Sequence, residues 1–449
     1  MFDPFPRLRR VWAALVLAAW CVVAAQAQEG AKPPAQRNGS EPAQVSHDAQ
    51  RAYESSRDKL VQIRTLLRNT NTQSSVGSGF FVSADGLIIT NFHVASQLAL
   101  EPDRYRGVYV PVDGKQADLE LLAFDVLHDL ALLRVKDAGP QRPALSFRAR
   151  DAALQRGERL YSLGNPLDIG FAVTEGTYNG LVQRSFYPRI FFGGAINPGM
   201  SGGPVIDEAG QVIGVNVSKR LDGELVSFLV PAEFAQALLA RAATATALTR
   251  KAHAEVTRQL VAHQEQVTQR FISTPFKAQR HGGYSVPVPD DALARCWGRA
   301  RDPDFKAFDL ERTNCQQDSQ LFAGDITTGF IRVRYEAYDA PKFSALRFAS
   351  MYSDSMANER FAVRATSRMT AAECSERFID RDGMAMRAVV CLNAYRKFQG
   401  LYNVSVLVTS LNRPTQGVQG RLDANGFSFD NSLALVAYYL NGFKWEGAR

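Results

Sequence analysis

Three short segments of the chain carry residues suited to acyl transfer by a serine. Ser201 lies in a run of sequence Gly-Met-Ser-Gly-Gly-Pro, His93 follows an apolar run at 87–90, and Asp129 directly precedes Leu-Ala-Leu-Leu. This chemistry needs a nucleophile, a base that takes its proton, an acid that orients the base, and backbone donors for the oxyanion. Glycines beside Ser201 allow a sharp turn that presents the N–H groups of Gly199 and Ser201 to one point. The three segments therefore supply a candidate for each of these four roles.

Each of these segments has a plainer explanation when it is taken alone. A glycine-rich run with a serine is often only a loop, a single histidine is more often structural than catalytic, and many aspartates simply cap turns. Two further polar residues, Asp125 and His128, lie close to Asp129 and compete with it for a role. Only the combination of the three segments favours catalysis.

Taken together, the motifs resemble those of the trypsin-like serine proteases, and especially the bacterial HtrA/Deg branch. The order His, Asp, Ser is the same, and the resemblance covers about 61–231. The matching motifs are Gly77-Ser78-Gly79-Phe80, Thr90-Asn91-Phe92-His93-Val94, Asp129-Leu130-Ala131-Leu132-Leu133, Gly164-Asn165-Pro166, Val173-Thr174-Glu175-Gly176 and Ala195-Ile196-Asn197-Pro198-Gly199-Met200-Ser201-Gly202-Gly203-Pro204.

The resemblance implies two six-stranded β-barrels with a catalytic triad in the cleft between them. Within it His93 is the base, Asp129 orients the histidine, and Ser201 is the nucleophile. The backbone N–H groups of Gly199 and Ser201 are the oxyanion donors. Asp129 is preferred over Asp125 because it directly precedes the apolar run, as the family pattern requires.

The chain departs from the HtrA/Deg pattern beside the nucleophile. Met200 stands where that branch usually has asparagine, and the segment 192–194 lacks the polar residues expected there. We therefore expect the oxyanion loop to rest in an inactive shape and to reorder when substrate binds. Met200 also cannot form the ion pair that activates trypsin zymogens, so no such processing is expected.

The pocket for the side chain before the scissile bond is expected from the segments near Ser201. Its predicted lining is Ala195, Val215, Asn216 and Val217. Ala195 offers no carboxylate for a basic side chain, so the sequence predicts a preference for a small or medium apolar residue.

The elements that must position these residues are short strands. Between about 51 and 231 many apolar or alternating runs are separated by turn signals, which is typical of a β-barrel or sandwich. The dipeptide Asp85-Gly86 between two such runs indicates a tight hairpin.

The chain after Pro231 changes character. The region 232–272 lacks Gly and Pro and has apolar residues at the helical period, which predicts a long helix or helix pair acting as a connector, with self-association through its apolar stripe as a second possibility. The region 273–289 is interpreted as a linker. Beyond it, alternating runs predict strands, and Thr370 with Glu373 suggests a capping box that opens a helix. Residues 284–449 are therefore predicted to form an α+β domain, which does not resemble a PDZ domain.

Four cysteines lie in that C-terminal region: Cys296, Cys315, Cys374 and Cys391. An even number in an exported chain suggests two disulfides, and we favour pairing of sequence neighbours among the three possible connectivities. Neither CxxC nor paired-histidine spacing accompanies them, so a metal site is not expected.

The N-terminus has the pattern of an export signal. Arginines precede an apolar run at 11–25 and an Ala-Gln-Ala sequence, which predicts a signal peptide over 1–27 that is removed rather than a membrane anchor. A polar flexible leader is expected over 28–50. The remaining predicted parts are a protease domain at 51–231, the helical connector and linker at 232–283, and the domain at 284–449. The location predicted is periplasmic or secreted.

The composition and charge of the chain limit the classes of partner to consider. The 449 residues are 46% hydrophobic and 22% charged, as in ordinary globular proteins, and the formal charge of +7 is spread without a long basic run. We expect neither nucleic acid nor a cofactor as partner. The sequence predicts an exported serine endopeptidase of protein substrates. A binding or chaperone-like module on a protease fold is the alternative, and an esterase is a smaller one.

Overall fold

The computed structural model describes residues 46–447, apart from 113, 137–140, 184, 220–224, 243, 301–306, 318–320, 358, 360 and 362–363. The predicted signal peptide and most of the predicted leader lie outside this part. Residues 45–449 form one compact unit. Its first element is α1 (His47–Ser56), which begins inside the region predicted to be a leader because Ser46 caps it and accepts a hydrogen bond from the Ala49 N–H at 3.1 Å.

Two closed six-stranded antiparallel barrels follow, as the sequence predicted. The first runs in the order β1-β2-β3-β6-β5-β4 and the second in the order β10-β11-β12-β9-β8-β7. The first contains β1 (Leu60–Leu67), β2 (Gln73–Phe81), β3 (Leu87–Thr90), β4 (Tyr105–Pro111), β5 (Ala117–Asp125) and β6 (Leu130–Val135), with α2 (Phe92–Leu100) between β3 and β4 and the 3-10 turn η1 (Arg57–Lys59) before β1. The second contains β7 (Arg159–Gly164), β8 (Ala172–Leu181), β9 (Ile190–Phe192), β10 (Pro204–Ile206), β11 (Val212–Lys219) and β12 (Ser227–Pro231), with η2 (Pro166–Asp168) after β7.

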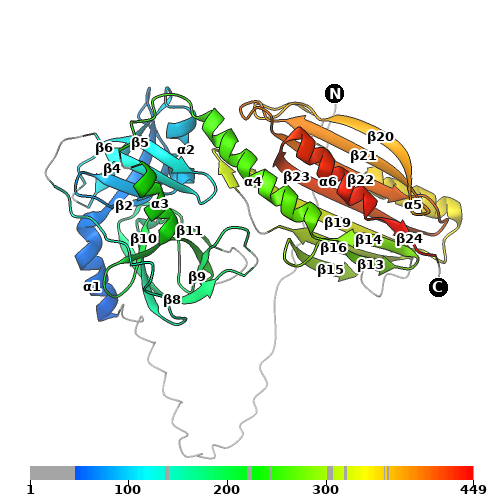
Figure 1. Cartoon of the computed structure of the whole chain (residues 1–449), viewed down its shortest axis with the longest axis horizontal. Coiled ribbons are helices and arrows are strands. Elements are labelled where there is room, and N and C mark those ends of the chain that lie inside the picture. Colours follow the sequence, from blue (N-terminus) through cyan, green and yellow to red (C-terminus); the bar gives the residue numbers. More distant parts are fainter. Residues whose placement is uncertain are drawn as a thin grey trace, which may run out of the picture. The chain divides into compact units, whose positions relative to one another are not determined.

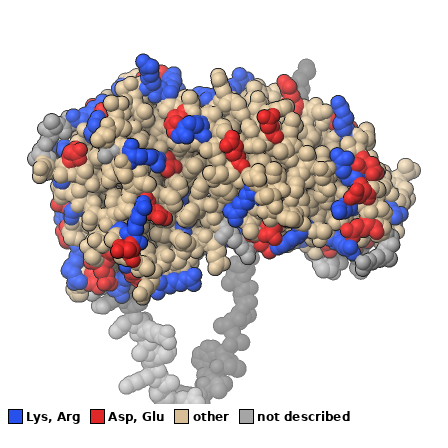
Figure 2. Space-filling view, in the orientation of Figure 1, with Lys and Arg blue, Asp and Glu red and all other residues tan. Residues whose placement is uncertain are grey.

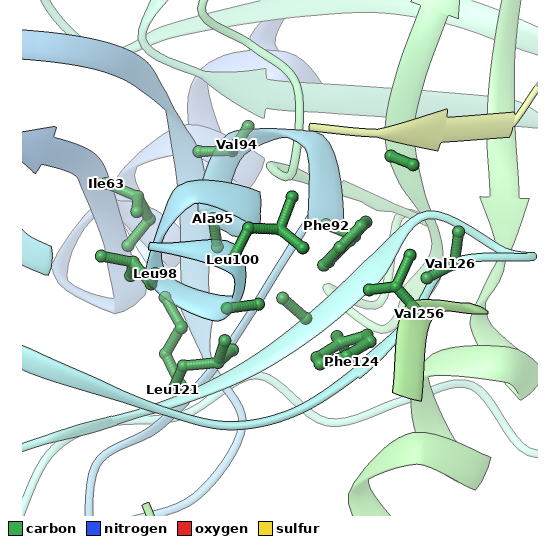
Figure 3. Packing of buried hydrophobic residues seen from close by; sticks show 14 of the residues in the cluster. Ile63, Phe92, Val94, Ala95, Leu98, Leu100, Leu121, Phe124, Val126 and Val256 are labelled. Carbon is green, nitrogen blue, oxygen red and sulfur yellow. The ribbon is translucent and has the colours of Figure 1, made fainter. Parts of the chain in front are cut away.

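The predicted connector is a pair of helices, α3 (Ala232–Ala242) and α4 (His253–Ser273). The start of α4 packs on the first barrel, where Val256 lies beside Phe92, Phe124 and Val126 (Figure 3). The later residues Val267 and Phe271 belong to the core of the C-terminal region. The apolar stripe that suggested self-association is therefore buried within the chain.

The C-terminal region is built on a seven-stranded antiparallel sheet, with α4 and α6 packed side by side against it (Figure 1). The sheet order is β15-β16-β19-β23-β22-β21-β20. Its members are β15 (Arg295–Ala300), β16 (Asp309–Gln316), β19 (Phe330–Asp339), β20 (Glu373–Arg381), β21 (Met384–Ala394), β22 (Tyr402–Ser410) and β23 (Gln416–Phe427), and its helices are α5 (Ala345–Ala357) and α6 (Phe429–Asn441). Two small sheets flank it, one of β13 (Lys277–His281), β14 (Tyr284–Val288) and β24 (Lys444–Trp445), the other a hairpin of β17 (Leu321–Ala323) and β18 (Ile326–Thr328).

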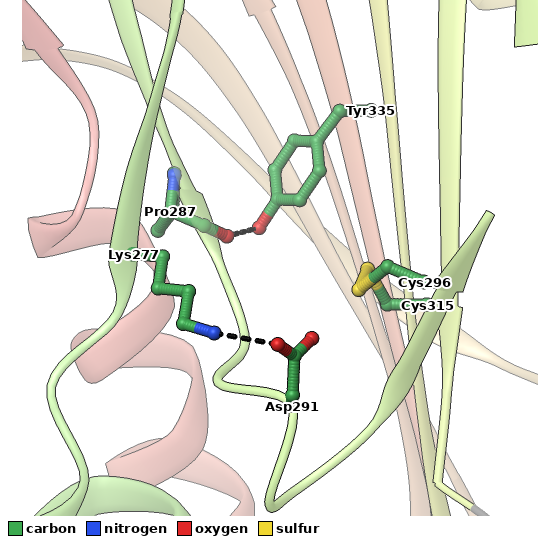
Figure 4. Close-up of a disulfide and its surroundings, with 6 residues drawn as sticks. All are labelled: Lys277, Pro287, Asp291, Cys296, Cys315 and Tyr335. Atoms are coloured by element: carbon green, nitrogen blue, oxygen red, sulfur yellow. Dashed lines mark hydrogen bonds and ion pairs between the residues drawn. A yellow bond between two sulfur atoms is a disulfide. The ribbon is translucent and has the colours of Figure 1, made fainter. Parts of the chain in front are cut away.

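Two local interpretations of this region were wrong. The segment interpreted as a linker forms the β13–β14 hairpin, because Gly282 with a φ of 58° supplies its turn and the Tyr335 hydroxyl donates to the Pro287 carbonyl (Figure 4). The helix expected near Thr370 is strand β20, since its pairing with β21 outweighs the local capping pattern.

The four cysteines form the two neighbour-paired disulfides that we favoured. Cys296 is bonded to Cys315 (Figure 4) and Cys374 to Cys391. Each pair joins residues directly opposite one another on adjacent antiparallel strands, β15 with β16 and β20 with β21. The strand register therefore selects the connectivity.

The surface carries charges of both signs. On the face in Figure 2, Lys and Arg alternate with Asp and Glu over both halves of the molecule. No helix in the described part of the chain combines the length and apolar character needed to cross a membrane.

Candidate active site

His93 is positioned by the end of β3 and the start of α2. Asn91 occupies the N-cap position of that helix without a side-chain capping bond, and its side-chain amide donates to the Asp129 carbonyl at 2.8 Å. Asp129 has a φ of 56° and occupies the turn between β5 and β6, so its carboxylate faces the helix start. Its Oδ1 accepts from the His93 backbone N–H at 2.8 Å, and its Oδ2 lies 2.6 Å from His93 Nδ1.

This arrangement fixes the chemistry of the imidazole. A carboxylate only accepts hydrogen bonds, so Nδ1 of His93 carries the hydrogen and Nε2 keeps a lone pair in the neutral ring. Burial lowers the pKa of His93, but the charge and hydrogen bond of Asp129 raise it more, so the net pKa is raised. Asp129 is buried, with a side chain only 5% exposed, whereas that of His93 is 29% exposed. The ring can thus take up a proton at a face open to substrate.

The competing pair Asp125 and His128 forms a separate unit. Asp125 accepts from His128 Nδ1 at 3.0 Å and from the guanidinium of Arg241 at 3.4 Å, and the His128 ring stacks on Phe234. Burial raises the pKa of Asp125, but its bonds to His128 lower it more. Neither residue pairs with His93 in the described part of the chain.

The Ser201 loop is held against the first barrel through glycines. The Ser201 carbonyl accepts from the Ser78 N–H at 2.8 Å. Gly202 has a φ of 85°, and a Cβ there would collide with the Ser78 carbonyl and the Thr90 hydroxyl. Since Thr90 ends the strand that leads to His93, this close packing brings the serine and histidine segments to the same cleft.

The loop leaves two backbone N–H groups uncommitted. The Pro198 carbonyl accepts from the Leu167 N–H at 2.8 Å, and the Ser78 hydroxyl donates to the Gly199 carbonyl at 2.7 Å. Gly199 has a φ of 93°. Among the described residues, the N–H groups of Gly199 and Ser201 find no acceptor. These two groups are the predicted oxyanion donors, and whether the loop reorders when substrate binds stays a prediction.

Met200 points away from the cleft. Its side chain is fully buried and packs with Ile196, Phe192 and Val205 inside the second barrel. Met200 therefore fills a hydrophobic core in place of asparagine, and its sulfur accepts a hydrogen bond from the Asn197 N–H at 3.5 Å within the loop.

One expected contact is not formed. Within the described residues, neither the Ser201 hydroxyl nor Nε2 of His93 has a hydrogen-bond partner, so the bond that would join them is open. Catalytic hydrogen bonds of this kind are often long in unliganded enzymes and tighten with substrate.

Two of the predicted pocket residues lie elsewhere. Val215 is fully buried in the core. The Asn216 side chain is also fully buried, where it accepts from the Ser162 hydroxyl at 2.9 Å and donates to a backbone carbonyl, because a buried amide must satisfy both its ends. Ala195 is partly buried, and Val217 lines a cavity of about 610 Å³. The sequence reasoning also missed the bridging role of Ser78, although it had identified the motif that contains it.

Comparison with known proteins finds a family and several relatives that are similar to part of this chain. Residues 77–215 match the model of the trypsin-like peptidase domain. The DegP-like periplasmic serine endoprotease of Ectopseudomonas mendocina is 34% identical over 168 residues, which cover 36% of this chain and 34% of that protein. Serine protease HTRA1 of Xenopus tropicalis is 33% identical over 172 residues, covering 36% of this chain and 35% of that protein. The chain thus spans about a third of the length of these curated relatives.

One solved structure aligns with less than half of this chain. The active form of the Rv3671c protease of M. tuberculosis aligns with 45% of this chain and 88% of its own at 25% identity, with a TM-score of 0.38.

Proposed function

From the premise that residues 77–215 form a trypsin-like peptidase domain related to the HtrA/Deg serine proteases, we propose that the protein is an exported serine endopeptidase. Ser201 is the nucleophile, His93 the general base and Asp129 the residue that orients it. The observation that carries the proposal is the double contact of Asp129 with the His93 N–H and ring. It supports a histidine held ready beside a serine loop that has two uncommitted N–H groups.

The proposed reaction proceeds through an acyl-enzyme. The Ser201 hydroxyl oxygen attacks the scissile carbonyl carbon while His93 Nε2 takes its proton. The N–H groups of Gly199 and Ser201 stabilise the oxyanion of the tetrahedral intermediate. His93 then gives the proton to the leaving amine as the C–N bond breaks. A water molecule next attacks the acyl carbon while His93 takes its proton, and His93 returns that proton to the Ser201 oxygen as the ester C–O bond breaks.

Export and substrate preference are part of the proposal. The apolar segment and Ala-Gln-Ala pattern of 1–27 suggest a cleaved signal, and two disulfides suit an oxidising compartment. The relative from Ectopseudomonas mendocina is named as periplasmic. We propose the periplasm or the medium as the location, protein chains as substrates, and a small or medium apolar residue before the scissile bond.

The test compares cleavage of unfolded casein by the mature protein and by Ser201→Ala. A fluorophosphonate, which reacts covalently with activated serines, is applied to both. We expect casein cleavage and labelling in the wild type and neither in Ser201→Ala. Ser375→Ala is the matched control, because Ser375 is an exposed serine on β20.

Each alternative has its own outcome. Casein cleavage equal in wild type and Ser201→Ala would point to a contaminating protease and a chaperone-like binding module. Hydrolysis of small esters without any cleavage of casein would point to an esterase.

A further inference from the structure

A cavity of about 610 Å³ adjoins the His93–Asp129 pair and is enclosed jointly by the peptidase domain and the C-terminal region. Val126 and Asp129 line it from the first barrel, and Val217 lines it from the second. Leu321 and Phe322 close it from the β17–β18 hairpin. This volume lies in the range of specific ligand sites, which are mostly apolar with a few placed polar groups.

The β17–β18 hairpin is held in place by buried side chains, so it forms a fixed side of the cavity. Leu321 and Ala323 are 2% and 1% exposed and pack into the core of the first barrel. Because side chains alternate along a strand, Phe322 between them points to the opposite side. Its ring centroid lies 5.8 Å from that of His93, and the residue remains 36% exposed. Phe322 thus presents an apolar face directly beside the catalytic imidazole.

The cavity is also lined by Arg189, a cation that forms no ion pair among the described residues. Arg189 is half-buried, and the only hydrogen bond of its guanidinium among the described residues is to the His128 carbonyl at 3.4 Å. The two carboxylates that influence it electrostatically, Asp129 and Asp125, are committed to His93 and His128. A guanidinium stays charged when it is partly buried, so several N–H donors of Arg189 have no acceptor among the described residues.

The other charges of the cavity have the same sign. Arg156 and Arg295 line it together with Arg189, and among the described residues Asp129 is the only carboxylate in the lining. A purely apolar occupant would leave the Arg189 charge desolvated and unpaired, which is costly. The complementary occupant has an apolar stem and a carboxylate.

We propose that this cavity is a substrate subsite that selects an acidic side chain of the peptide near the scissile bond. Arg189 binds the carboxylate, and Phe322 with Val217 contacts the aliphatic stem. The C-terminal region thereby supplies a specificity-determining wall of the active site. The inference rests on the proposed peptidase function and deepens it.

The test measures peptide binding to full-length Ser201→Ala, which does not depend on turnover. A peptide library carries Glu or Gln at each position in turn, and affinities are measured by calorimetry for the best pair. We expect Glu to bind about tenfold more tightly than Gln at one position, as one charge-assisted hydrogen bond predicts. When Arg189→Gln is added to Ser201→Ala, the Glu and Gln peptides should bind with nearly equal affinity. Arg189→Lys should keep part of the preference for Glu.

Matched variants separate this role from general effects. Arg150→Gln removes an exposed charge that does not line the cavity and should leave the ratio unchanged. In the catalytically intact chain, Phe322→Ala should raise KM for the Glu peptide severalfold while fluorophosphonate labelling of Ser201 stays within about twofold, since one apolar contact is lost. Phe378→Ala, at an exposed phenylalanine of β20, is its control.

The inference fails if Glu and Gln peptides bind alike, or if Arg189→Gln keeps the preference. It also fails if Phe322→Ala speeds peptide cleavage, because the hairpin would then cover the site instead of lining it. Failure of the peptidase function gives a different result, the absence of fluorophosphonate labelling in the wild type.

Discussion

Asp129 contacts His93 through both carboxylate oxygens, one on the backbone N–H and one on ring Nδ1, at 2.8 and 2.6 Å. The first contact fixes the start of α2 and the second fixes the tautomer and orientation of the ring. Position and protonation of the base are therefore set by one side chain.

Asp129→Asn should lower kcat by about 10³- to 10⁴-fold, because an amide can stabilise the wrong tautomer and cannot balance the imidazolium charge. Steady-state hydrolysis of a peptide ester by the purified variant measures this loss. Asp125→Asn, which alters the neighbouring Asp125–His128 pair, should cost less than about tenfold, since that pair does not touch the reacting groups. Equal losses in the two variants would contradict the assignment.

The pH dependence of kcat/KM should report His93. The reaction needs the neutral ring, so activity rises with pH through its pKa, and the contact with Asp129 places that pKa above the usual 6.5. Asp129→Asn should move the rising limb to lower pH in what activity remains. A limb that stays in place after that substitution would show that another group controls it.

Met200→Asn should destabilise the protein although it restores the residue usual in the HtrA/Deg branch. The side chain is fully buried in the second barrel, so the substitution places an unpaired amide in the core and removes packing, at a cost of about 2–4 kcal/mol. Met200→Leu, of similar volume, should cost less than about 1.5 kcal/mol. Urea unfolding followed by tryptophan fluorescence measures both. An Asn variant as stable as the wild type would contradict this packing role.

His263 makes the junction between the two halves sensitive to acid. This fully buried residue of α4 bonds to the Tyr187 hydroxyl and to the Gly329 carbonyl, and burial lowers its pKa to about 4 despite the opposing effect of the carbonyl. As pH falls from about 6.5 toward 4, the unfolded chain binds a proton that the folded chain rejects, so about 3 kcal/mol of stability is lost over that window.

Unfolding free energies at pH 7 and pH 4.5 test this directly. At pH 7 the unfolding free energy of His263→Gln should be lower than that of the wild type. Between pH 7 and pH 4.5 it should decrease less than that of the wild type. His47→Gln, at an exposed position of α1, should keep the wild-type slope. A His263→Gln profile parallel to that of the wild type would contradict the assignment.

The sequence by itself determined what depends on neighbours along the chain. Short apolar and alternating runs predicted the strands of a barrel or sandwich, because the period of side chains along a strand is two, and the family resemblance implied two barrels. The glycines beside Ser201 and the apolar run after Asp129 identified the catalytic candidates through local motifs. Proximity along the chain favoured the pairing of neighbouring cysteines, but the strand register selected it among the three possible connectivities.

The tertiary structure decided what depends on distant segments. No local pattern indicates that Asn216 turns inward to Ser162 or that Met200 fills the second barrel. Nor does any indicate that Phe322, more than 200 residues along the chain, lies beside His93. Phe322 is placed there because apolar surfaces of the first barrel, α4 and the β17–β18 hairpin are buried against one another, and such burial depends on area and fit, not on sequence spacing.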